Sequence, residues 1–387
     1  MTPLIRTTVV DVDLDAVAAN TRALRQRAGV DVIAVVKADG YGHGAEAVAE
    51  TAIESGAAAL AVATVEEAVV LRRTMPRGTI LVLLGAQSQA ERDAAIAGGL
   101  AVTVWDVESA AALGEAARAA RSTAMVHFKL DTGLTRLGAP FAQAVERFKA
   151  IGTLSGVRVD GVFTHLARAD EADLLTTTEQ LDRFDEFLDA ITPPRWVHTS
   201  ATGGIASLAT RPRITAVRPG LGLYGLHAAP HLADRLALRP ALTWRSRVHR
   251  VADVQAGTGV SYGHDYRLPR DGQVATVPVG YGDGLARAAG KGARLLVNGT
   301  AAAIAGRVAM DHVMLDVTDI DGVREGDEVV VIGTQRGVIV TAEDLAAACG
   351  TIHYEVVTAI RARVPRRYHR GGTVVATKTL ADGYVRC

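Results

Sequence analysis

A lysine stands directly after an apolar run in residues 31–44, which read DVIAVVKADGYGHG. The five residues before Lys37 are all apolar, and a loop with three glycines, a tyrosine and a histidine follows it. Lysine is rarely buried unless something compensates its charge. Two interpretations of Lys37 are therefore open: a strand-end residue whose ammonium group reaches water, or an amine that acts as a nucleophile.

Polar residues follow four further apolar runs in the same way. One run ends in HFKLDTGLTRLG, and the others end in a histidine, in a threonine–serine pair and in an arginine ahead of glycines. The residues concerned are Lys129, Asp131, Arg136, His165, Thr199, Ser200, Arg218 and Gly220. These residues can act together only if the fold brings the ends of the apolar runs close to one another.

The apolar runs alternate with alanine-rich stretches of helical spacing over about the first 225 residues. Continuous apolar strands that alternate with helices are typical of a parallel sheet. The candidate strands are 31–37, 58–63, 79–84, 101–105, 124–130, 158–165, 195–199 and 215–218, and amphipathic stretches such as 43–55, 65–74, 106–121, 139–152 and 176–190 lie between them. Eight such units predict a (β/α)8 TIM-type barrel, with a doubly wound open sheet as the alternative.

The pattern of residues changes after Pro240. Segments such as QVATVPVG and DEVVVIG are rich in strand-forming residues, and pairs such as Asn298-Gly299 mark turns between them. We expect a mostly antiparallel β domain with a helix near 342–348. The predicted division assigns 11–235 to a cofactor-binding barrel, and 1–10 plus 236–387 to a β-rich C-terminal domain.

The predicted barrel would turn these scattered polar residues into one site. Functional groups of such barrels gather where the strands end, and the loops after the seventh and eighth strands often hold a phosphate. Here those loops offer the Ser200 hydroxyl and backbone N–H groups freed by glycines, which suit an anion. A lysine, a phosphate site and a barrel together point to pyridoxal 5'-phosphate held by Lys37 as a Schiff base.

The composition argues against several other classes of protein. The 387 residues carry 42 basic and 42 acidic side chains, so neither a nucleic-acid surface nor a basic membrane face is expected. Cys349 and Cys387 are too few for a disulfide framework or a metal cluster. We find no signal-peptide pattern and no apolar stretch long enough to span a bilayer. These features predict a cytoplasmic, metal-free enzyme.

Eight short motifs strengthen this interpretation. They are AVVKADGYGHG (34–44), KLDTGLTRLG (129–138), THLARAD (164–170), VRPGLGLYG (217–225), GVSYGHDY (259–266), VPVGYGDG (277–284), GRVAMDH (306–312) and IHYEVVTAI (352–360). In these motifs, and over essentially its whole length, the sequence resembles the alanine racemase family of fold-type III pyridoxal-phosphate enzymes. The resemblance implies an isomerase that interconverts L- and D-alanine, supplies D-alanine for peptidoglycan and acts as a homodimer with shared active sites.

The resemblance also implies a role for each matching residue. Lys37 matches the cofactor-bound lysine and first base, and Tyr262 matches the second base, which the partner subunit supplies. Arg218 matches the partner of the pyridine nitrogen, with His165 beside it in a hydrogen-bond chain toward the second base. The remaining matches are Tyr41, Ser200, Gly220, Leu221 and Tyr354 as phosphate contacts, Arg136 and the partner's Met310 as substrate-carboxylate contacts, Tyr281 with Tyr354 as the gate, and Lys129 as a lysine that is often carbamylated.

Elementary chemistry supports two bases. Racemisation removes the α-proton from one face and returns one to the other, so two groups on opposite faces are the simpler solution. A tyrosinate at pH 7 costs about 4 kcal/mol, since a free phenol has a pKa of about 10, and nearby positive charge would offset part of this. Arg218 facing the pyridine nitrogen would keep its own proton. The nitrogen should then stay neutral, which disfavours transamination.

Two positions depart from the pattern that is usual in the family. Thr199 stands where asparagine is frequent, which puts any contact of that amide with the cofactor in doubt. Asp39 also replaces an asparagine and adds a negative charge near Lys37, unless its side chain points away along the turn. Ser200 suits a helix N-cap as well as a phosphate ligand.

Three other functions remain as alternatives. A serine or broad-specificity racemase of the same family would differ in the room around Arg136, Tyr281, Met310 and Tyr354. A fold-type III decarboxylase would carry an acid where Arg218 stands, and a catalytic cysteine in the C-terminal domain. A non-catalytic pyridoxal-phosphate carrier would match the barrel alone.

Overall fold

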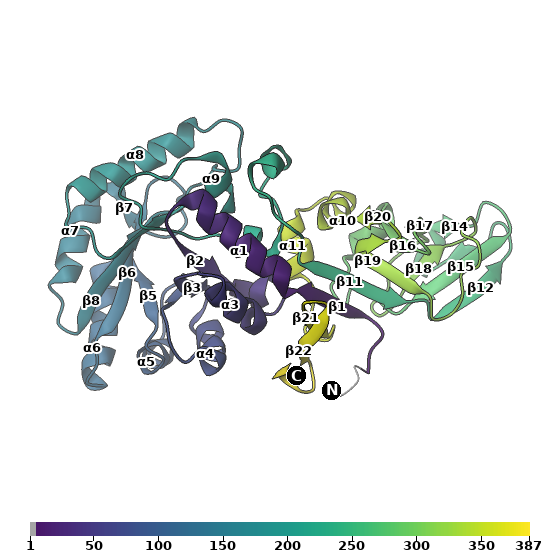
Figure 1. Cartoon of the computed structure of the whole chain (residues 1–387), viewed down its shortest axis with the longest axis horizontal. Coiled ribbons are helices and arrows are strands. Elements are labelled where there is room, and N and C mark those ends of the chain that lie inside the picture. Colours follow the sequence, from purple (N-terminus) through teal and green to yellow (C-terminus); the bar gives the residue numbers. More distant parts are fainter. Residues whose placement is uncertain (1–4) are drawn as a thin grey trace. The chain divides into compact units, whose positions relative to one another are not determined.

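The computed structural model describes residues 5–387 and divides into two compact units (Figure 1). One unit, here the barrel unit, comprises Ala16–Gly40 and Ala45–Pro240. The other, here the β unit, comprises the described residues up to Asp15, the short segment Tyr41–Gly44 and Ala241–Cys387. The segment that follows Lys37 therefore leaves the barrel unit for four residues and then returns to it.

Eight parallel strands form a closed barrel. They pair in the order β2-β3-β4-β5-β6-β8-β9-β10, with β10 pairing back to β2. The strands are β2 (Asp31–Val35), β3 (Ala59–Val62), β4 (Ile80–Val82), β5 (Ala101–Val104), β6 (Ala124–Asp131), β8 (Val157–Phe163), β9 (Trp196–Thr199) and β10 (Ala216–Val217). The predicted barrel is confirmed, and the open-sheet alternative is wrong because β5 pairs with β6 and closes the ring.

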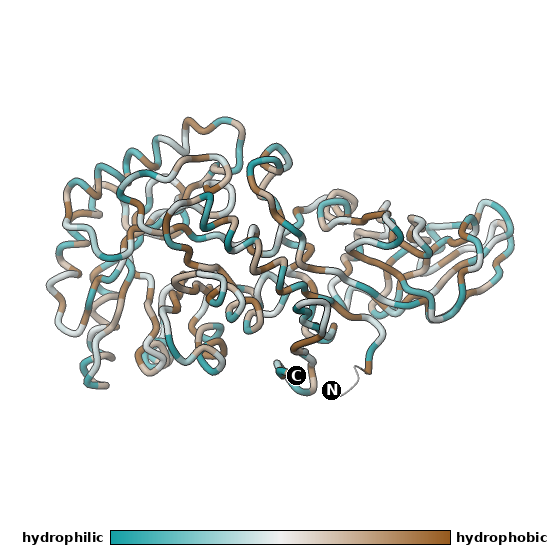
Figure 2. Tube along the Cα trace, in the orientation of Figure 1, coloured by the Kyte–Doolittle hydropathy of each residue, from teal (hydrophilic) through white to brown (hydrophobic). Residues whose placement is uncertain are grey.

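Helices alternate with the strands of the barrel. They are α1 (Leu14–Ala28), α3 (Ala45–Glu54), α4 (Val65–Thr74), α5 (Gln89–Ala97), α6 (Val107–Ala119), α7 (Phe141–Gly152), α8 (Leu175–Asp189) and α9 (Thr202–Ser207). Three of them begin at side-chain caps from Thr64, Ser88 and Asp106, which satisfy free backbone N–H groups. Figure 2 shows the apolar residues along the barrel strands. Within the described residues, no helix is long and apolar enough to cross a membrane.

The β unit is built on a mixed but mostly antiparallel sheet, as predicted. Its strands are β1 (Val9–Asp13), β11 (Leu242–Arg247), β12 (Arg250–Val254), β15 (Gly272–Val277), β16 (Arg294–Val297), β17 (Thr300–Ile304), β18 (Val313–Asp316), β19 (Glu328–Gln335), β20 (Val338–Val340), β21 (Arg366–Arg370), β22 (Thr373–Thr379) and β23 (Gly383–Arg386). Strand β1 joins its two parts, since it pairs antiparallel with β11 and parallel with β21. The predicted helix is α10 (Ala342–Cys349), and α11 (His353–Thr358) follows it.

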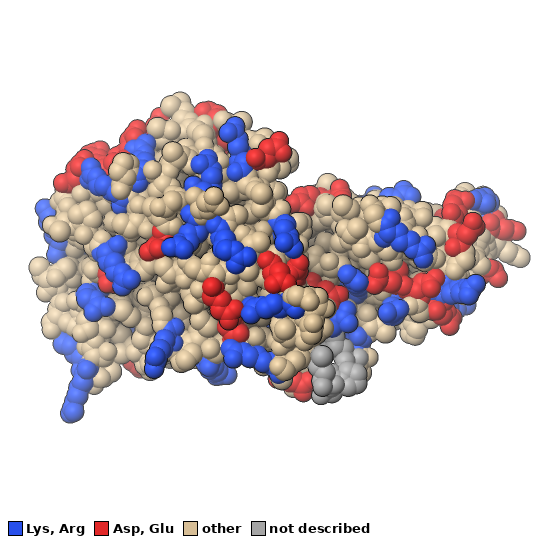
Figure 3. Space-filling model, in the orientation of Figure 1, with Lys and Arg blue, Asp and Glu red and all other residues tan. Residues whose placement is uncertain are grey.

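Charges of both signs alternate over the face of the molecule drawn in Figure 3. No single-sign field dominates that face, because basic and acidic side chains lie among each other.

A buried arginine fixes the segment 41–44 within the β unit. The Arg366 guanidinium donates to the carbonyl of Gly42 from Nε (3.2 Å) and from one Nη (3.0 Å). The same guanidinium donates to the carbonyls of Ile360, Arg361 and Val364 at 2.6 to 2.7 Å. One side chain thus ties the chain just after Lys37 to the turn that precedes β21.

Arg366→Met is expected to destabilise the protein by about 3 kcal/mol or more, because several buried carbonyls lose a charged donor at once. Chemical unfolding in urea measures this loss. Arg367→Met is the matched control, since Arg367 is about a third exposed and only pairs with Asp11 at 2.7 Å, so about 1 kcal/mol is expected there. Equal losses in the two variants would contradict the proposed role of Arg366.

Candidate active site

The chain turns left-handed directly after Lys37. The short element α2 (Lys37–Tyr41) contains Ala38 at φ 52°, Asp39 at φ 52° and Gly40 at φ 62°, and Tyr41 has φ 51°. Each non-glycine residue in this conformation costs on the order of 1 kcal/mol. Such strain persists only where surrounding contacts enforce it, and it clusters at functional sites.

Glu67 on α4 is one of the groups that enforce the turn. Its Oε1 accepts a hydrogen bond from the Ala38 N–H at 2.7 Å. Its Oε2 accepts from the N–H groups of Ala63 at 2.7 Å and Thr64 at 3.2 Å. A single carboxylate therefore caps α4 and holds the backbone of the residue next to Lys37.

The side chain of Asp39 is directed along the turn rather than toward the barrel lysine. Its Oδ1 accepts a hydrogen bond from the N–H of Ala45 at 3.0 Å, where α3 begins. Asp39 therefore supplies an acceptor to the start of the next helix, a role that the Oδ1 of an asparagine could also fill.

Glu67→Gln is expected to lower the pKa of Lys37 further below its ordinary value. Burial and the charge of Arg136 lower this pKa, and the carboxylate of Glu67 raises it. Without that carboxylate, the Lys37 amine of the apoenzyme should react with an acylating reagent at lower pH, which peptide mass spectrometry would measure. Glu66→Gln removes an exposed charge on the same helix and should leave the pH dependence of Lys37 acylation unchanged. An equal shift of the pH dependence of Lys37 acylation in both variants would contradict the assigned effect of Glu67 on the Lys37 pKa.

Four cationic groups and a histidine surround the C-terminal end of the barrel. Burial lowers the pKa of Lys129 to about 8, and the charges of Arg136, Arg218 and Lys37 lower it too. Burial likewise keeps the pKa of His165 well below its usual value, followed by the charges of the same four cations. Groups that perturb one another in this way are close in space. The structure thus brings together five residues that the sequence picked out separately.

Arg218 is the most confined of these cations. One Nη donates to the Thr164 carbonyl at 2.7 Å and to His165 Nδ1 at 3.2 Å, and the other donates to His198 Nδ1 at 2.8 Å. Burial lowers its pKa to about 9, which still leaves it protonated at neutral pH. None of the ion pairs within residues 5–387 includes Arg218. Its buried positive charge is therefore available to an anionic or electron-rich ligand.

The loop after β9 holds two hydroxyl groups. Ser200 has φ 51° and accepts the Arg218 N–H through its carbonyl at 2.9 Å. Its own hydroxyl makes no hydrogen bond to any described residue, and it does not cap α9, whose N-cap is Ala201. The N-cap interpretation of Ser200 is therefore wrong. The buried Oγ1 of Thr199 also has no hydrogen-bond partner in the described chain.

The loop after β10 leads into a short 3-10 helix, η1 (Leu221–Tyr224), which Gly220 precedes. Thr202 Oγ1 accepts the N–H of Gly222 at 2.9 Å and so ties this loop to α9. The Tyr224 hydroxyl donates to the Val35 carbonyl at 3.1 Å. These bonds fix the backbone N–H groups of Gly220 and Leu221 next to the end of β2.

The remaining predicted site residues belong to the β unit. Tyr41 and Tyr354 lie with ring centroids 6.5 Å apart, and burial raises the pKa of Tyr41 far above its ordinary value. Tyr41 is therefore a neutral hydroxyl group that can donate a hydrogen bond to a ligand.

Tyr262 lies on a loop of the β unit and projects into solvent, with 70% of its surface exposed in the single chain. Ser261 before it has φ 63°, and its hydroxyl donates to the Arg307 carbonyl at 2.6 Å. The Arg307 side chain pairs with Asp265 at 2.5 Å on the other side of the loop. These two contacts hold the loop that carries the exposed Tyr262 ring.

Tyr281 and Met310 lie on two connected turns of the β unit. The Tyr281 N–H donates to the Ala309 carbonyl at 3.1 Å, and the Gly282 N–H donates to the Met310 carbonyl at 2.8 Å. Both side chains are exposed, at 36% for Tyr281 and 53% for Met310. Beneath them, the buried Asp283 accepts from the Gly280 N–H at 3.0 Å and anchors the first turn.

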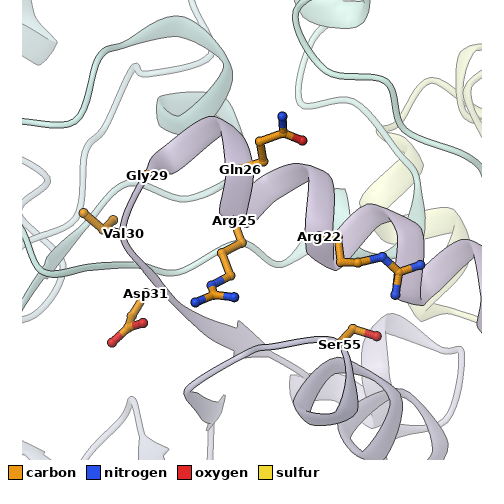
Figure 4. A pocket seen from close by; sticks show the side chains of 7 residues that line it. All are labelled: Arg22, Arg25, Gln26, Gly29, Val30, Asp31 and Ser55. Atoms are coloured by element: carbon orange, nitrogen blue, oxygen red, sulfur yellow. The ribbon is translucent and has the colours of Figure 1, made fainter.

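A separate pocket lies at the opposite end of the barrel (Figure 4). It is lined by Arg22, Arg25, Gln26, Gly29, Val30, Asp31 and Ser55. Asp31 is the first residue of β2, whereas Lys37 follows the end of that strand. Because barrel enzymes place their chemistry where the strands end, this pocket is not the catalytic centre.

Sequence reasoning missed three residues that support the site: Glu67, His127 and His198. The pattern Thr64-x-x-Glu67 is a capping-box signal that could have drawn attention to Glu67. His127 precedes Lys129 by two residues on one strand, so both side chains point to the same face.

Comparisons with known proteins agree with this geometry. The family model for the alanine racemase N-terminal domain matches residues 12–228, and the model for the alanine racemase C-terminal domain matches residues 241–368. The chain is 43% identical over 369 residues to an alanine racemase of Symbiobacterium thermophilum, covering 94% of this chain and 97% of that protein. It is 40% identical over 373 residues to an alanine racemase of Mycobacterium ulcerans, covering 94% and 95%.

Solved structures of alanine racemases superpose over nearly the whole chain. The structure from Bacillus anthracis with bound L-Ala-P has a TM-score of 0.91 at 34% identity and covers 98% of this chain and 100% of that one. The structure from the D-cycloserine producer Streptomyces lavendulae has a TM-score of 0.87 at 38% identity, covering 95% and 98%. With a closed barrel, a cationic site around Lys37 and these full-length matches, the chain belongs to the alanine racemase family and is a racemase, an enzyme of the isomerase class.

Proposed function

We propose that this enzyme interconverts L- and D-alanine with pyridoxal 5'-phosphate as its cofactor. The observation that carries the proposal is the cluster of Lys37, Lys129, Arg136 and Arg218 at the C-terminal end of the barrel, whose charges lower the pKa of His165 and of Lys129 within the cluster. A cluster of cations in one partly buried site calls for anions, and a phosphorylated cofactor with an amino-acid carboxylate would supply them.

The residues present fit this cofactor. Lys37 supplies an amine with a lowered pKa, and the Ser200 hydroxyl and the N–H groups of Gly220 and Leu221 would hold a phosphate, with the hydroxyls of Tyr41 and Tyr354. Arg218 would donate to the ring nitrogen. The unpartnered Oγ1 of Thr199 leaves one buried polar atom for the same ligand. When bound, pyridoxal phosphate supplies the electron sink that makes the α-proton of an amino acid acidic.

The protein itself would move the proton. Lys37 would serve as the base on one face of the substrate, and Tyr262 of the partner subunit would serve on the other. Arg136 makes no hydrogen bond or ion pair within residues 5–387, so its guanidinium is available to the substrate carboxylate, beside the N–H of Met310 from the partner subunit. Tyr281 and Tyr354 would narrow the entrance.

Lys129 is suited to carbamylation. The reaction joins a neutral amine to carbon dioxide, releases one proton and leaves a carbamate anion. A pKa of about 8 raises the fraction of neutral amine at neutral pH. The carbamate would then replace a buried cation by an anion that can hold Arg136 in place. Intact-mass spectrometry under carbon dioxide would detect the added carboxyl group.

The exposed position of Tyr262 supports the proposal that the enzyme is a homodimer. Each barrel would receive Tyr262 and Met310 from its partner, as expected for an isologous pair. The two cysteines form no disulfide and suit a reducing compartment, so we propose that the enzyme works in the cytoplasm and supplies D-alanine for peptidoglycan.

A racemisation assay on purified protein would test the function. L-Alanine and L-serine are incubated with and without pyridoxal phosphate and analysed by chiral chromatography. Fast formation of D-alanine with slow formation of D-serine supports the proposal. Equal rates would support the alternative of a broad-specificity or serine racemase, and no racemisation of either amino acid would refute both.

A further inference from the structure

A chain of three buried side chains crosses the interior of the barrel below the candidate site. Arg218 Nη1 lies 2.8 Å from His198 Nδ1, and His198 Nε2 lies 2.7 Å from His127 Nδ1. Both histidines are completely buried. The proposed function uses Arg218 and gives neither histidine a role.

The direction of these hydrogen bonds is fixed by chemistry. Arginine can only donate, so His198 Nδ1 must accept and its proton must sit on Nε2. His198 then donates to His127 Nδ1, and the proton of His127 sits on its own Nε2. A proton on His198 Nδ1 would place two donors face to face. Burial and the charge of Arg218 keep the pKa of both histidines low, to about 3 for His127, so both rings stay neutral.

The barrel is shaped to let these rings meet. His127 on β6 and His198 on β9 flank the intervening strand β8. At the crossing point β8 carries Gly161, where an added Cβ would lie 2.5 Å from His127 Nδ1. Phe163 on β8 stacks on the His198 ring, with the two ring centroids 4.6 Å apart. The centroid of the Phe163 ring also lies 4.8 Å from the guanidinium carbon of Arg218. Gly161 thus leaves room for the His127 ring, and the flat ring of Phe163 packs against His198. Together they keep Arg218, His198 and His127 in line.

Space filling alone does not explain this arrangement. Apolar side chains would fill the barrel without the penalty of burying polar groups. His127 Nε2 has no hydrogen-bond partner within residues 5–387, so the network is not even fully satisfied. What the two imidazoles do provide is a single acceptor on the side of Arg218 that faces away from Thr164.

We propose that His127 is a positioning residue: its Nδ1 accepts the Nε2–H of His198 and holds the His198 ring where Nδ1 faces the Arg218 guanidinium, which fixes the orientation of that guanidinium. Pinned at one Nη by His198 and at the other by Thr164 and His165, the guanidinium cannot rotate. The first two links are the hydrogen bonds from His198 to His127 and from Arg218 to His198, and they do not depend on the proposed function. Only the last link, from Arg218 to the cofactor ring, rests on it.

Nitrogen-15 NMR of the apoenzyme tests the first two links without any activity measurement. We expect His198 Nδ1 to be unprotonated and the two Nη groups of Arg218 to give separate signals. His127→Leu removes the acceptor and should merge the Arg218 signals through rotation, whereas His127→Asn keeps an acceptor oxygen and should restore them. A protonated Nδ1 in wild-type His198, or unaltered Arg218 signals in a folded His127→Leu variant, would overturn the proposal.

Steady-state kinetics test the last link. In His127→Leu, kcat should fall about 10- to 100-fold with little change in KM, and His127→Asn should recover most of it. Gly161→Ala keeps both histidines but displaces His127, so it should match His127→Leu. Gly152→Ala on α7, where no atom lies within 4 Å of the new Cβ, is the control. Unchanged kcat in His127→Leu overturns this link, whereas a wild-type enzyme that racemises nothing refutes the proposed function and leaves the NMR result standing.

Discussion

Lys37→Ala is expected to lower the rate of alanine racemisation by about 10⁴-fold or more, because one residue serves both as cofactor anchor and as base. Chiral chromatography measures the rate, and visible absorbance measures whether the cofactor is still bound to a lysine. Stability should not fall. Burial and the charge of Arg136 outweigh the attraction of Glu67 and lower the pKa of Lys37, so the ammonium form is disfavoured on balance in the folded protein.

Lys149→Ala is the matched control for this substitution. Lys149 lies exposed on α7, away from the strand ends, and its removal should leave the racemisation rate unchanged. If Lys37→Ala retained more than a few per cent of the activity while Lys149→Ala did not, the site would have been placed at the wrong end of the barrel.

Tyr262→Phe is expected to lower kcat by about 10²- to 10⁴-fold, the usual contribution of one acid–base group. The loss should be asymmetric. With Lys37 intact, the enzyme should still exchange the α-proton of one alanine enantiomer with deuterated water and should no longer exchange that of the other. Proton NMR of each enantiomer in turn measures this difference.

The folding stability of the single chain should change little in Tyr262→Phe, because the residue is mostly exposed there. Tyr266→Phe is the control from the same loop: its hydroxyl donates to Asp316 at 2.5 Å, so stability should fall while exchange persists for both enantiomers. Equal loss of exchange for both enantiomers in Tyr262→Phe would argue against two bases on opposite faces.

The barrel was predictable from sequence because eight mostly apolar runs alternate with amphipathic stretches, and five of these runs end in polar residues. Lys37, His165, Ser200 and Arg218 could be assigned to one face, since parallel strands end on the same side. Closure of the ring could not be read from the sequence, because it depends on the pairing of β5 with β6 rather than on local preference.

The supporting residues were harder to find because they act over long distances in the chain. Glu67 holds the backbone of Ala38 from 29 residues away. His127 and His198 meet only because Gly161 lies between them on a third strand. The left-handed turn was also hidden, since alanine and tyrosine, here Ala38 and Tyr41, rarely adopt that conformation.

Mixing two inactive variants tests most directly the claim that each site combines Lys37 of one chain with Tyr262 of the other. Lys37→Ala and Tyr262→Phe are each purified, mixed in equal amounts and allowed to exchange subunits. The account predicts recovery of about a quarter of the wild-type activity, because half of the dimers are mixed and each mixed dimer has one intact site. No recovery, in a mixture where native mass spectrometry detects mixed dimers, would contradict the shared site.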